Sequence, residues 1–155
     1  MPLTLREQLQ PSGEPDRPAL DPWAGDGVRG KMNLLGLQAF LELIHFDLYL
    51  KRGNFSALYD RVRKYPVETK VAPGDPVTQI CAGMDTACIW YWKEVLCLQR
   101  SAATACLLKR YGVPAQLVIG AQRLPFKAHA WVEVNGRVVN DKPYVPEIYA
   151  VLDRC

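Results

Sequence analysis

Apolar residues recur at spacings of three and four through the first half of the chain, a period that predicts helices buried on one face. The first helix is expected over residues 32–51, because Gly53 then ends the pattern. Its apolar stripe consists of Leu37, Phe40, Leu41, Ile44 and Leu48. Glu42, His45 and Asp47 near the middle are costly in hydrocarbon, so we expect a buried or amphipathic helix and no membrane span. Peripheral membrane contact is the alternative.

Two further helices have start signals of their own. Ser56 is expected to cap a helix over residues 56–65, with Leu58 and Val62 facing inward. Asp75-Pro76 starts the next helix, as N-cap and first helical residue. Its apolar positions at helical spacing are Val77, Ile80, Cys81, Met84, Cys88 and Tyr91. This pattern predicts that Cys81 and Cys88 are core residues.

The second half of the chain changes to strands after one more helix. That helix starts at or near Cys97 and ends before Gly112, and its small side chains permit close packing on a sheet. A strand is expected at 115–120 and a hairpin with strands near 129–134 and 137–141. The predicted fold class is α+β, with a helical N-terminal half followed by a small antiparallel sheet packed on the helix that begins with Cys97.

The length of 155 residues suits one domain with a sizeable core. Residues 1–30 are expected to form a flexible tail, since prolines and glycines interrupt any helix there, and the domain occupies residues 31–155. That tail lacks the apolar core of a signal peptide. The chain has five cysteines, an odd number. The lack of a signal peptide and this odd number together predict free thiols in a reducing, cytoplasmic setting.

Composition excludes several function classes. The net charge of +3 is small, and no stretch combines clustered basic residues with aromatic ones, so nucleic-acid binding is not expected. The chain contains no CxxC, HExxH or HxH pattern and no phosphate-binding GxxxxGK[ST] loop. We therefore expect no metal and no cofactor.

Cys97, His129 and Asp141 occur in the order and the settings that cysteine-nucleophile chemistry requires. A helix N-terminus favours the thiolate of Cys97, as does a neighbouring imidazolium. His129 begins a strand after a loop, whereas the other histidine, His45, suits a packed helix position. Asp141 would accept from the imidazole N–H and orient the ring. A nucleophile at a helix start, with base and carboxylate on a following hairpin, is the geometry of papain-like and transglutaminase-like enzymes.

Hairpin register decides whether His129 and Asp141 lie on one face of the sheet. A two-residue turn at Asn135-Gly136 would put them on opposite faces. A three-residue loop with a left-handed glycine would instead pair Glu133 with Arg137 and put both groups on one face. We predict the three-residue loop, because it also brings opposite charges together. Opposite faces would exclude a triad.

An acyl-transfer site also needs hydrogen-bond donors for its oxyanion. The backbone N–H of Cys97 is one candidate, and the sequence does not choose among the side-chain candidates. These are Gln79, Trp90 and Trp92. Packing is the alternative role for both tryptophans. Phe126 and Trp131 are candidates for lining the substrate cleft, with core packing again the alternative.

A series of short motifs with specific spacing extends over residues 77–142. They are Cys97-Leu98, Arg100-Ser101, Leu107-Leu108, Arg110, Gly112, 118–120, Pro125-Phe126, 128–133 and Asn140-Asp141. Together they resemble the signature of the lasso peptide maturation proteases, the transglutaminase-like leader peptidases of lasso peptide biosynthesis. A shared Cys, His and Asp would indicate only the wider superfamily, and the block over 125–133 makes the resemblance specific to this family. Residues 102–104 depart from the family pattern.

The resemblance implies a cysteine peptidase that cleaves the leader from a lasso precursor peptide through an acyl-enzyme. It also implies a separate small leader-recognition protein and an ATP-dependent macrolactam synthetase that acts next. Two alternatives use the same residues differently: an acyltransferase or transglutaminase on the same triad, and a non-catalytic peptide-binding subunit.

Overall fold

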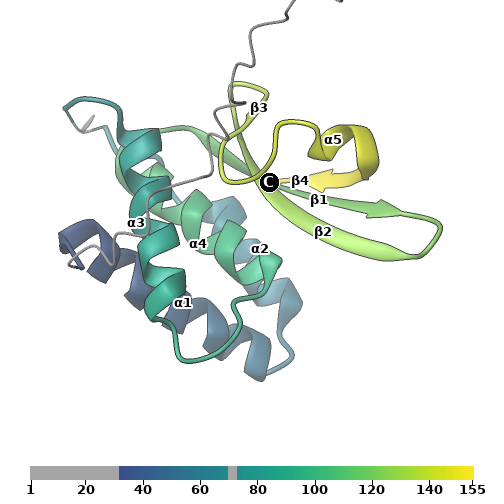
Figure 1. Cartoon of the computed structure of the whole chain (residues 1–155), viewed down its shortest axis with the longest axis horizontal. Helices are drawn as coiled ribbons and strands as arrows, with labels where there is room; N and C mark the ends of the chain where they lie inside the picture. Colours follow the sequence, from purple (N-terminus) through teal and green to yellow (C-terminus); the bar gives the residue numbers. More distant parts are fainter. Residues whose placement is uncertain (1–31, 70–72) are drawn as a thin grey trace, which may run out of the picture.

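The computed structural model describes residues 32–69 and 73–155, so the predicted tail over 1–30 lies outside the described residues. The elements are α1 (Leu34–Lys51), α2 (Phe55–Lys64), α3 (Pro76–Trp90), α4 (Cys97–Arg110), β1 (Ala115–Gln122), β2 (Lys127–Val134), β3 (Arg137–Val138), α5 (Val145–Ile148) and β4 (Ala150–Arg154). The four long helices gather on one side, and the β1–β2 hairpin extends beyond them (Figure 1). The predicted α+β fold class is confirmed.

The first three helices begin at side chains that accept hydrogen bonds from their first turns. Asn33 caps α1 at 2.8 Å from the Gly36 N–H, and Asp75 caps α3 as predicted. The cap of α2 is Asn54, whose Oδ1 lies 3.0 Å from the Ala57 N–H. The prediction of Ser56 as this cap is therefore wrong, because asparagine two residues earlier already satisfies the first turn.

α1 is buried on a different face from the predicted stripe. Ala39, Leu43 and Phe46 are fully buried, while Leu41 is 57% exposed. Leu37 and Leu48 are also exposed. α1 crosses α3 where Gly36 meets Gly83, and a Cβ on Gly83 would lie 3.4 Å from the Gly36 nitrogen. This close approach sets which face of α1 is buried, and Leu37, Leu41 and Leu48 lie outside that face. No helix among the described residues is long and apolar enough to cross a membrane.

α4 is the central helix of the fold. It packs against α1, α2 and α3 and, on its other side, against β1 and β2. Between Gln99 and Lys109 every side chain except that of Arg100 is buried. The small residues predicted to allow this packing are all buried: Ser101, Ala102, Ala105 and Cys106. Cys81 and Cys88, predicted to be core residues, are half-buried beside this core.

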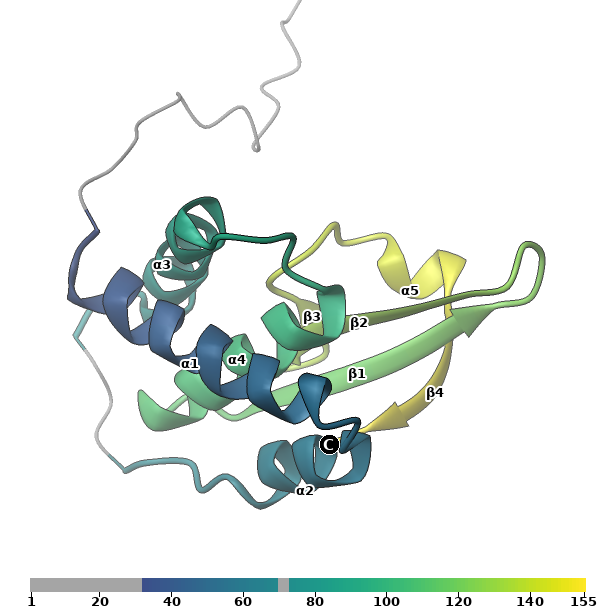
Figure 2. The same ribbon diagram turned by 90° about the horizontal axis from the view of Figure 1, so that it is seen from below.

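The sheet has the strand order β3-β2-β1-β4 and is antiparallel throughout. β1 pairs with β2 so that Gly120 lies opposite His129 and Val118 opposite Trp131. β4 was not predicted. It continues into Cys155, whose N–H and C=O both bond to the backbone of Leu117 at 2.9 and 2.7 Å. The end of the chain thereby becomes an edge strand beside β1, visible in Figure 2.

The turn between β2 and β3 contains two residues, so the predicted three-residue loop is wrong. Val134 pairs with Arg137, and Glu133 pairs with Val138 instead of Arg137. Asn135 has φ 51° and Gly136 φ 74°, the positive values that a two-residue type I′ turn requires at both positions. Asparagine tolerates this region better than other non-glycine residues, which makes the tighter turn accessible.

Candidate active site

His129 and Asp141 are in direct contact although the turn is the one that should separate them. His129 Nε2 lies 2.7 Å from Asp141 Oδ2. The reason is that the regular ladder ends at Val138. Val139 N–H still donates to Val132 O, but the Val132 N–H donates to the side chain of Asn140, 2.7 Å away, where a backbone carbonyl would stand. The chain leaves the strand there, and Asp141 returns to the His129 face.

Asn140 also joins this hairpin to α4. Its Nδ2 donates to Ser101 Oγ at 2.9 Å, and Ser101 Oγ donates to the C=O of Ala130 at 2.9 Å. All three residues are buried. We call Ser101, Ala130 and Asn140 the Ser101 cluster. Ala130 follows His129 and Asn140 precedes Asp141, so the cluster fixes the backbone beside both groups to one point on α4.

Cys97 is the first residue of α4, and its side chain is exposed. It stands four residues before Ser101, so the two lie one turn apart on the same face of the helix. Figure 2 shows this end of α4 next to β2 and β3. Among the described residues Cys97 makes no hydrogen bond to His129 or Asp141. Such contacts are often long in a free enzyme and tighten when substrate binds.

The N-terminus of α4 differs from those of the other long helices. Its N-cap is Leu96, which provides no side-chain hydrogen bond. Its first turn, like those of the other three, contains no acidic residue. The other three long helices all have an Asn or Asp cap. The N–H groups of the first turn at Cys97 are thus left for another acceptor, and the helix dipole adds partial positive charge there. This suits the developing oxyanion of an acyl-transfer step.

Aromatic rings surround the imidazole of His129. Its centroid lies 5.1 Å from that of Tyr149 and 6.2 Å from that of Trp131. Trp131 is fully buried, and its Nε1–H donates to Glu133 at 2.9 Å. The prediction that Trp131 lines the substrate cleft is therefore wrong, because no part of the ring is accessible. A Cβ on Gly120 would lie 2.7 Å from this ring, so Gly120 makes room for it.

The remaining sequence candidates lie in different places. Phe126 is 77% exposed in the turn that joins β1 and β2. Trp92 is exposed and stacks on Tyr91, in the segment that leads to Cys97, and Trp90 is also exposed. Gln79 belongs to the first turn of α3, beside Gly74. The middle of α3 lies against the hairpin, since the Cys81 thiol donates to the C=O of Val139 at 3.3 Å, and Gln79 remains a candidate oxyanion donor.

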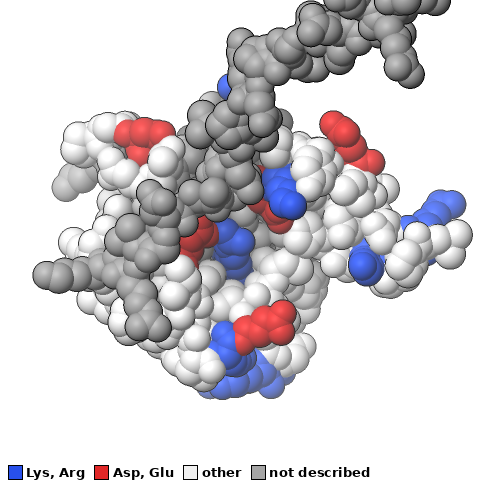
Figure 3. All heavy atoms as spheres, in the orientation of Figure 1, with Lys and Arg blue, Asp and Glu red and all other residues white. Residues whose placement is uncertain are grey.

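Sequence reasoning missed a charged pocket next to Asp141. Its volume is about 240 Å³, and its lining consists of Asp85, Arg100, Asn140, Asp141 and Lys142. Arg100 pairs with Asp85, and its buried Nε has no hydrogen-bond partner. Figure 3 shows a face that is hollowed near its centre, with side chains of both signs in and around the hollow. Residues of this pocket belong to the Arg100-Ser101 and Asn140-Asp141 motifs. The sequence alone did not indicate that these two motifs lie next to each other in the fold.

The other four cysteines are distinguished from Cys97 by burial. Burial raises the pKa of Cys81 to about 11 and that of Cys106 to about 12. The pKa values of Cys88 and Cys155 are raised by the same cause. These four thiols therefore stay protonated at neutral pH. Within residues 32–69 and 73–155 no three His, Cys, Asp or Glu side chains gather as a metal ion would require.

Comparisons with known proteins show the family of the chain. The family model of the transglutaminase-like superfamily matches residues 40–154. Over 56 residues, or 36% of the chain, the sequence is 41% identical to the Microcin J25-processing protein McjB of Escherichia coli, and the match spans 27% of that protein's length. No solved structure gave a significant match. The resemblance drawn from the motifs is thereby confirmed, and the chain belongs to the transglutaminase-like superfamily.

Proposed function

We propose that this protein is a cysteine peptidase that removes the leader from a lasso precursor peptide. The observation that supports it most is the contact of His129 with Asp141, which the Ser101 cluster ties to the helix that begins with Cys97. The similarity to a protein named for processing microcin J25 supports a role in peptide processing.

In the proposed reaction Cys97 is the nucleophile, His129 the base and Asp141 the residue that orients the ring. A carboxylate only accepts hydrogen bonds, so His129 Nε2 carries the proton toward Asp141 and Nδ1 is left for the thiol. In the serine-protease template the carboxylate holds the other ring nitrogen, Nδ1, and its function is the same.

The thiol proton passes to His129 as Sγ attacks the carbonyl that joins leader and core. The oxyanion would be stabilised by the free N–H groups of the first turn of α4. The C–N bond then breaks, and His129 protonates the leaving amine, which frees the core peptide. Water, deprotonated by His129, hydrolyses the thioester, and the leader departs with a new carboxylate.

The partners in this proposal are the precursor peptide, a separate small protein that recognises the leader, and an ATP-dependent macrolactam synthetase that uses the free core. They rest on the sequence resemblance. The exposed end of α4 and the charged pocket beside Asp141 are open surfaces at which a bound peptide could lie.

The test compares wild type, Cys97→Ala and Cys88→Ala in cleavage of the precursor, followed by intact mass. Cys88 is half-buried in α3 and serves as a matched cysteine-to-alanine control. We expect wild type and Cys88→Ala to yield leader acid and core amine, and Cys97→Ala to bind precursor without cleaving it. Cleavage by Cys97→Ala would exclude the peptidase as proposed. An amide-linked adduct in place of leader acid would identify an acyltransferase instead.

A further inference from the structure

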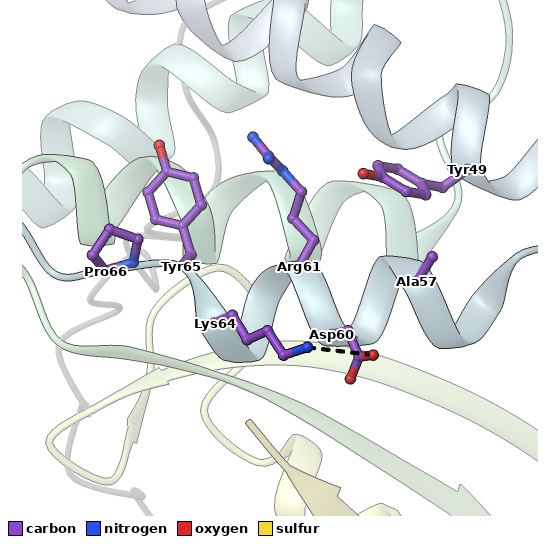
Figure 4. Close-up of a pocket in the computed structure, with 7 residues that line it drawn as sticks. All are labelled: Tyr49, Ala57, Asp60, Arg61, Lys64, Tyr65 and Pro66. Carbon is purple, nitrogen blue, oxygen red and sulfur yellow. Dashed lines mark ion pairs between the residues drawn. The ribbon is translucent and has the colours of Figure 1, made fainter.

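A second pocket lies between the end of α1 and α2, away from the candidate active site. Its volume is about 460 Å³, and its lining consists of Tyr49, Ala57, Asp60, Arg61, Lys64, Tyr65 and Pro66. We call it the Arg61 pocket. In Figure 4 the Arg61 side chain rises from α2 between the rings of Tyr49 and Tyr65, while Lys64 and Asp60 pair with each other below it.

Arg61 makes no ion pair with an acidic group among the described residues. Three neighbouring cations have an anionic partner: Lys64 has Asp60, Arg63 has Asp153, and Arg110 has Glu42. A fourth, Lys109, donates to the C=O of Val62 at 2.7 Å. Arg61 Nε is buried without a hydrogen-bond partner, and the guanidinium lies 5.5 Å from the centroid of the Tyr65 ring. A buried donor on a charged group that lacks an acceptor is costly, so the site favours a ligand that supplies one.

The groups around Arg61 reinforce this preference. His45 lies behind it on α1, against the Tyr49 ring at 5.2 Å, and its Nε2 also has no hydrogen-bond partner. Burial, and after it the charge of Arg61, lower the pKa of His45 against the opposing effect of the Glu42 carboxylate, so the ring is neutral and does not compete as a cation. The Tyr65 hydroxyl accepts from Arg110 Nε at 3.0 Å, which leaves its own O–H free to donate into the pocket.

We propose that the Arg61 pocket binds a carboxylate carried by a peptide, either an Asp or Glu side chain or a chain end. The guanidinium offers parallel N–H donors that match a carboxylate, and the rings of Tyr49 and Tyr65 flank it (Figure 4). The lining contains two cations, Arg61 and Lys64, and one carboxylate, Asp60. This excess of one positive charge matches a monoanion better than a phosphate dianion.

The Arg61 pocket is separate from the proposed chemistry. Its Tyr65 contacts Arg110 at the last residue of α4, whereas Cys97 is the first. Thirteen residues of helix separate these two by about 20 Å. A peptide acid held there would lie far from a bond attacked at Cys97. Carboxylate binding at the Arg61 pocket is therefore independent of whether Cys97 is the nucleophile of a peptidase.

The experiment titrates the protein with a short peptide that has both ends blocked and contains one glutamate, the same blocked peptide with glutamine, acetate and inorganic phosphate. The readout is the NMR signal of the His45 ring, which is easily assigned because the chain has two histidines. The variants are Arg61→Gln and Arg61→Lys, and the matched control is Arg63→Gln. Arg63 is on the same helix but outside the pocket.

We expect a saturable His45 shift with the glutamate peptide, unchanged in Arg63→Gln and weaker in affinity by about tenfold or more in Arg61→Gln. The affinity of Arg61→Lys should lie between these two, because lysine keeps the positive charge but lacks the parallel N–H donors of the guanidinium. Equal response to the glutamine peptide, an unchanged affinity in Arg61→Gln, or tighter binding of phosphate than of acetate would each overturn the proposal. So would a shift that never saturates, which would mean that water alone occupies the pocket.

Discussion

Removal of the Ser101 hydroxyl would test whether the Ser101 cluster holds the candidate active site together. In Ser101→Ala the C=O of Ala130 and the Nδ2–H of Asn140 both lose their partner on α4. Each buried group left unsatisfied costs about 1–3 kcal/mol, so we expect the two together to lower the free energy of unfolding by roughly 2–6 kcal/mol. A domain of this kind has about 5–15 kcal/mol in total, so the variant should still fold over most of that range.

The catalytic effect should exceed the effect on the folded fraction. Without the cluster the hairpin segments that contain His129 and Asp141 are no longer fixed to the helix of Cys97. A misplacement of about 1 Å is enough to lower a rate by roughly 100-fold. We therefore expect single-turnover cleavage of the precursor to fall by about two orders of magnitude under conditions where the variant is fully folded.

Thr104→Val is the matched control for this experiment. Thr104 is also buried on α4, but its hydroxyl donates to the Arg100 C=O of its own helix at 2.8 Å. Its loss should change stability by less than about 1 kcal/mol and leave cleavage near wild type. Urea denaturation and quenched-flow cleavage measure the two quantities. Ser101→Ala that loses stability as expected but cleaves at the wild-type rate would refute the role of the Ser101 cluster in positioning His129 and Asp141. Equally slow cleavage by Thr104→Val would refute it too.

Three further outcomes are expected. At pH 7 iodoacetamide should modify Cys97 first, because a pKa of about 11 for Cys81 and about 12 for Cys106 leaves only ~10⁻⁴ and ~10⁻⁵ of these thiols ionised; peptide mapping that found equal labelling would count against an activated Cys97. Asp141→Asn should lower cleavage by roughly 10²–10⁴-fold with little change in precursor affinity, since it loses the carboxylate that orients His129; unchanged turnover would exclude this role. Gly136→Ala should cost about 1–2 kcal/mol in urea denaturation through its φ of 74° alone, because open space surrounds that position, and no loss would dispute the two-residue turn.

The sequence predicted the order of elements well, since helix caps and small residues act locally. Asp75-Pro76 starts α3, and the small residues of α4 are buried as expected. The packed face of α1 could not be predicted, because that helix is apolar on more than one side and the Gly36–Gly83 contact that orients it joins distant segments. β4 was missed for a similar reason: its partner strand, β1, lies far away in the sequence.

In the candidate site, too, local features could be predicted from the sequence and contacts between distant segments could not. The sequence predicted that His129 and Asp141 would lie on one face, and they do, but not through the three-residue loop. The actual cause is Asn140, which replaces a backbone partner of Val132 and so ends the ladder. A pairing rule that considers only turn length and alternation cannot include a side chain of this kind. The unpaired Arg61 could not be found either, because its neighbours' partners come from α1, α2 and β4.

The central claim is that Cys97 forms an acyl bond with the leader. It is tested most directly by acid-quenching the protein milliseconds to seconds after it is mixed with precursor and measuring its intact mass. We expect a transient adduct equal to the leader mass less one water, located on the peptide that contains Cys97, together with release of an equal amount of core amine. Core amine released with no adduct at any time, or an adduct located on another cysteine, would contradict the claim.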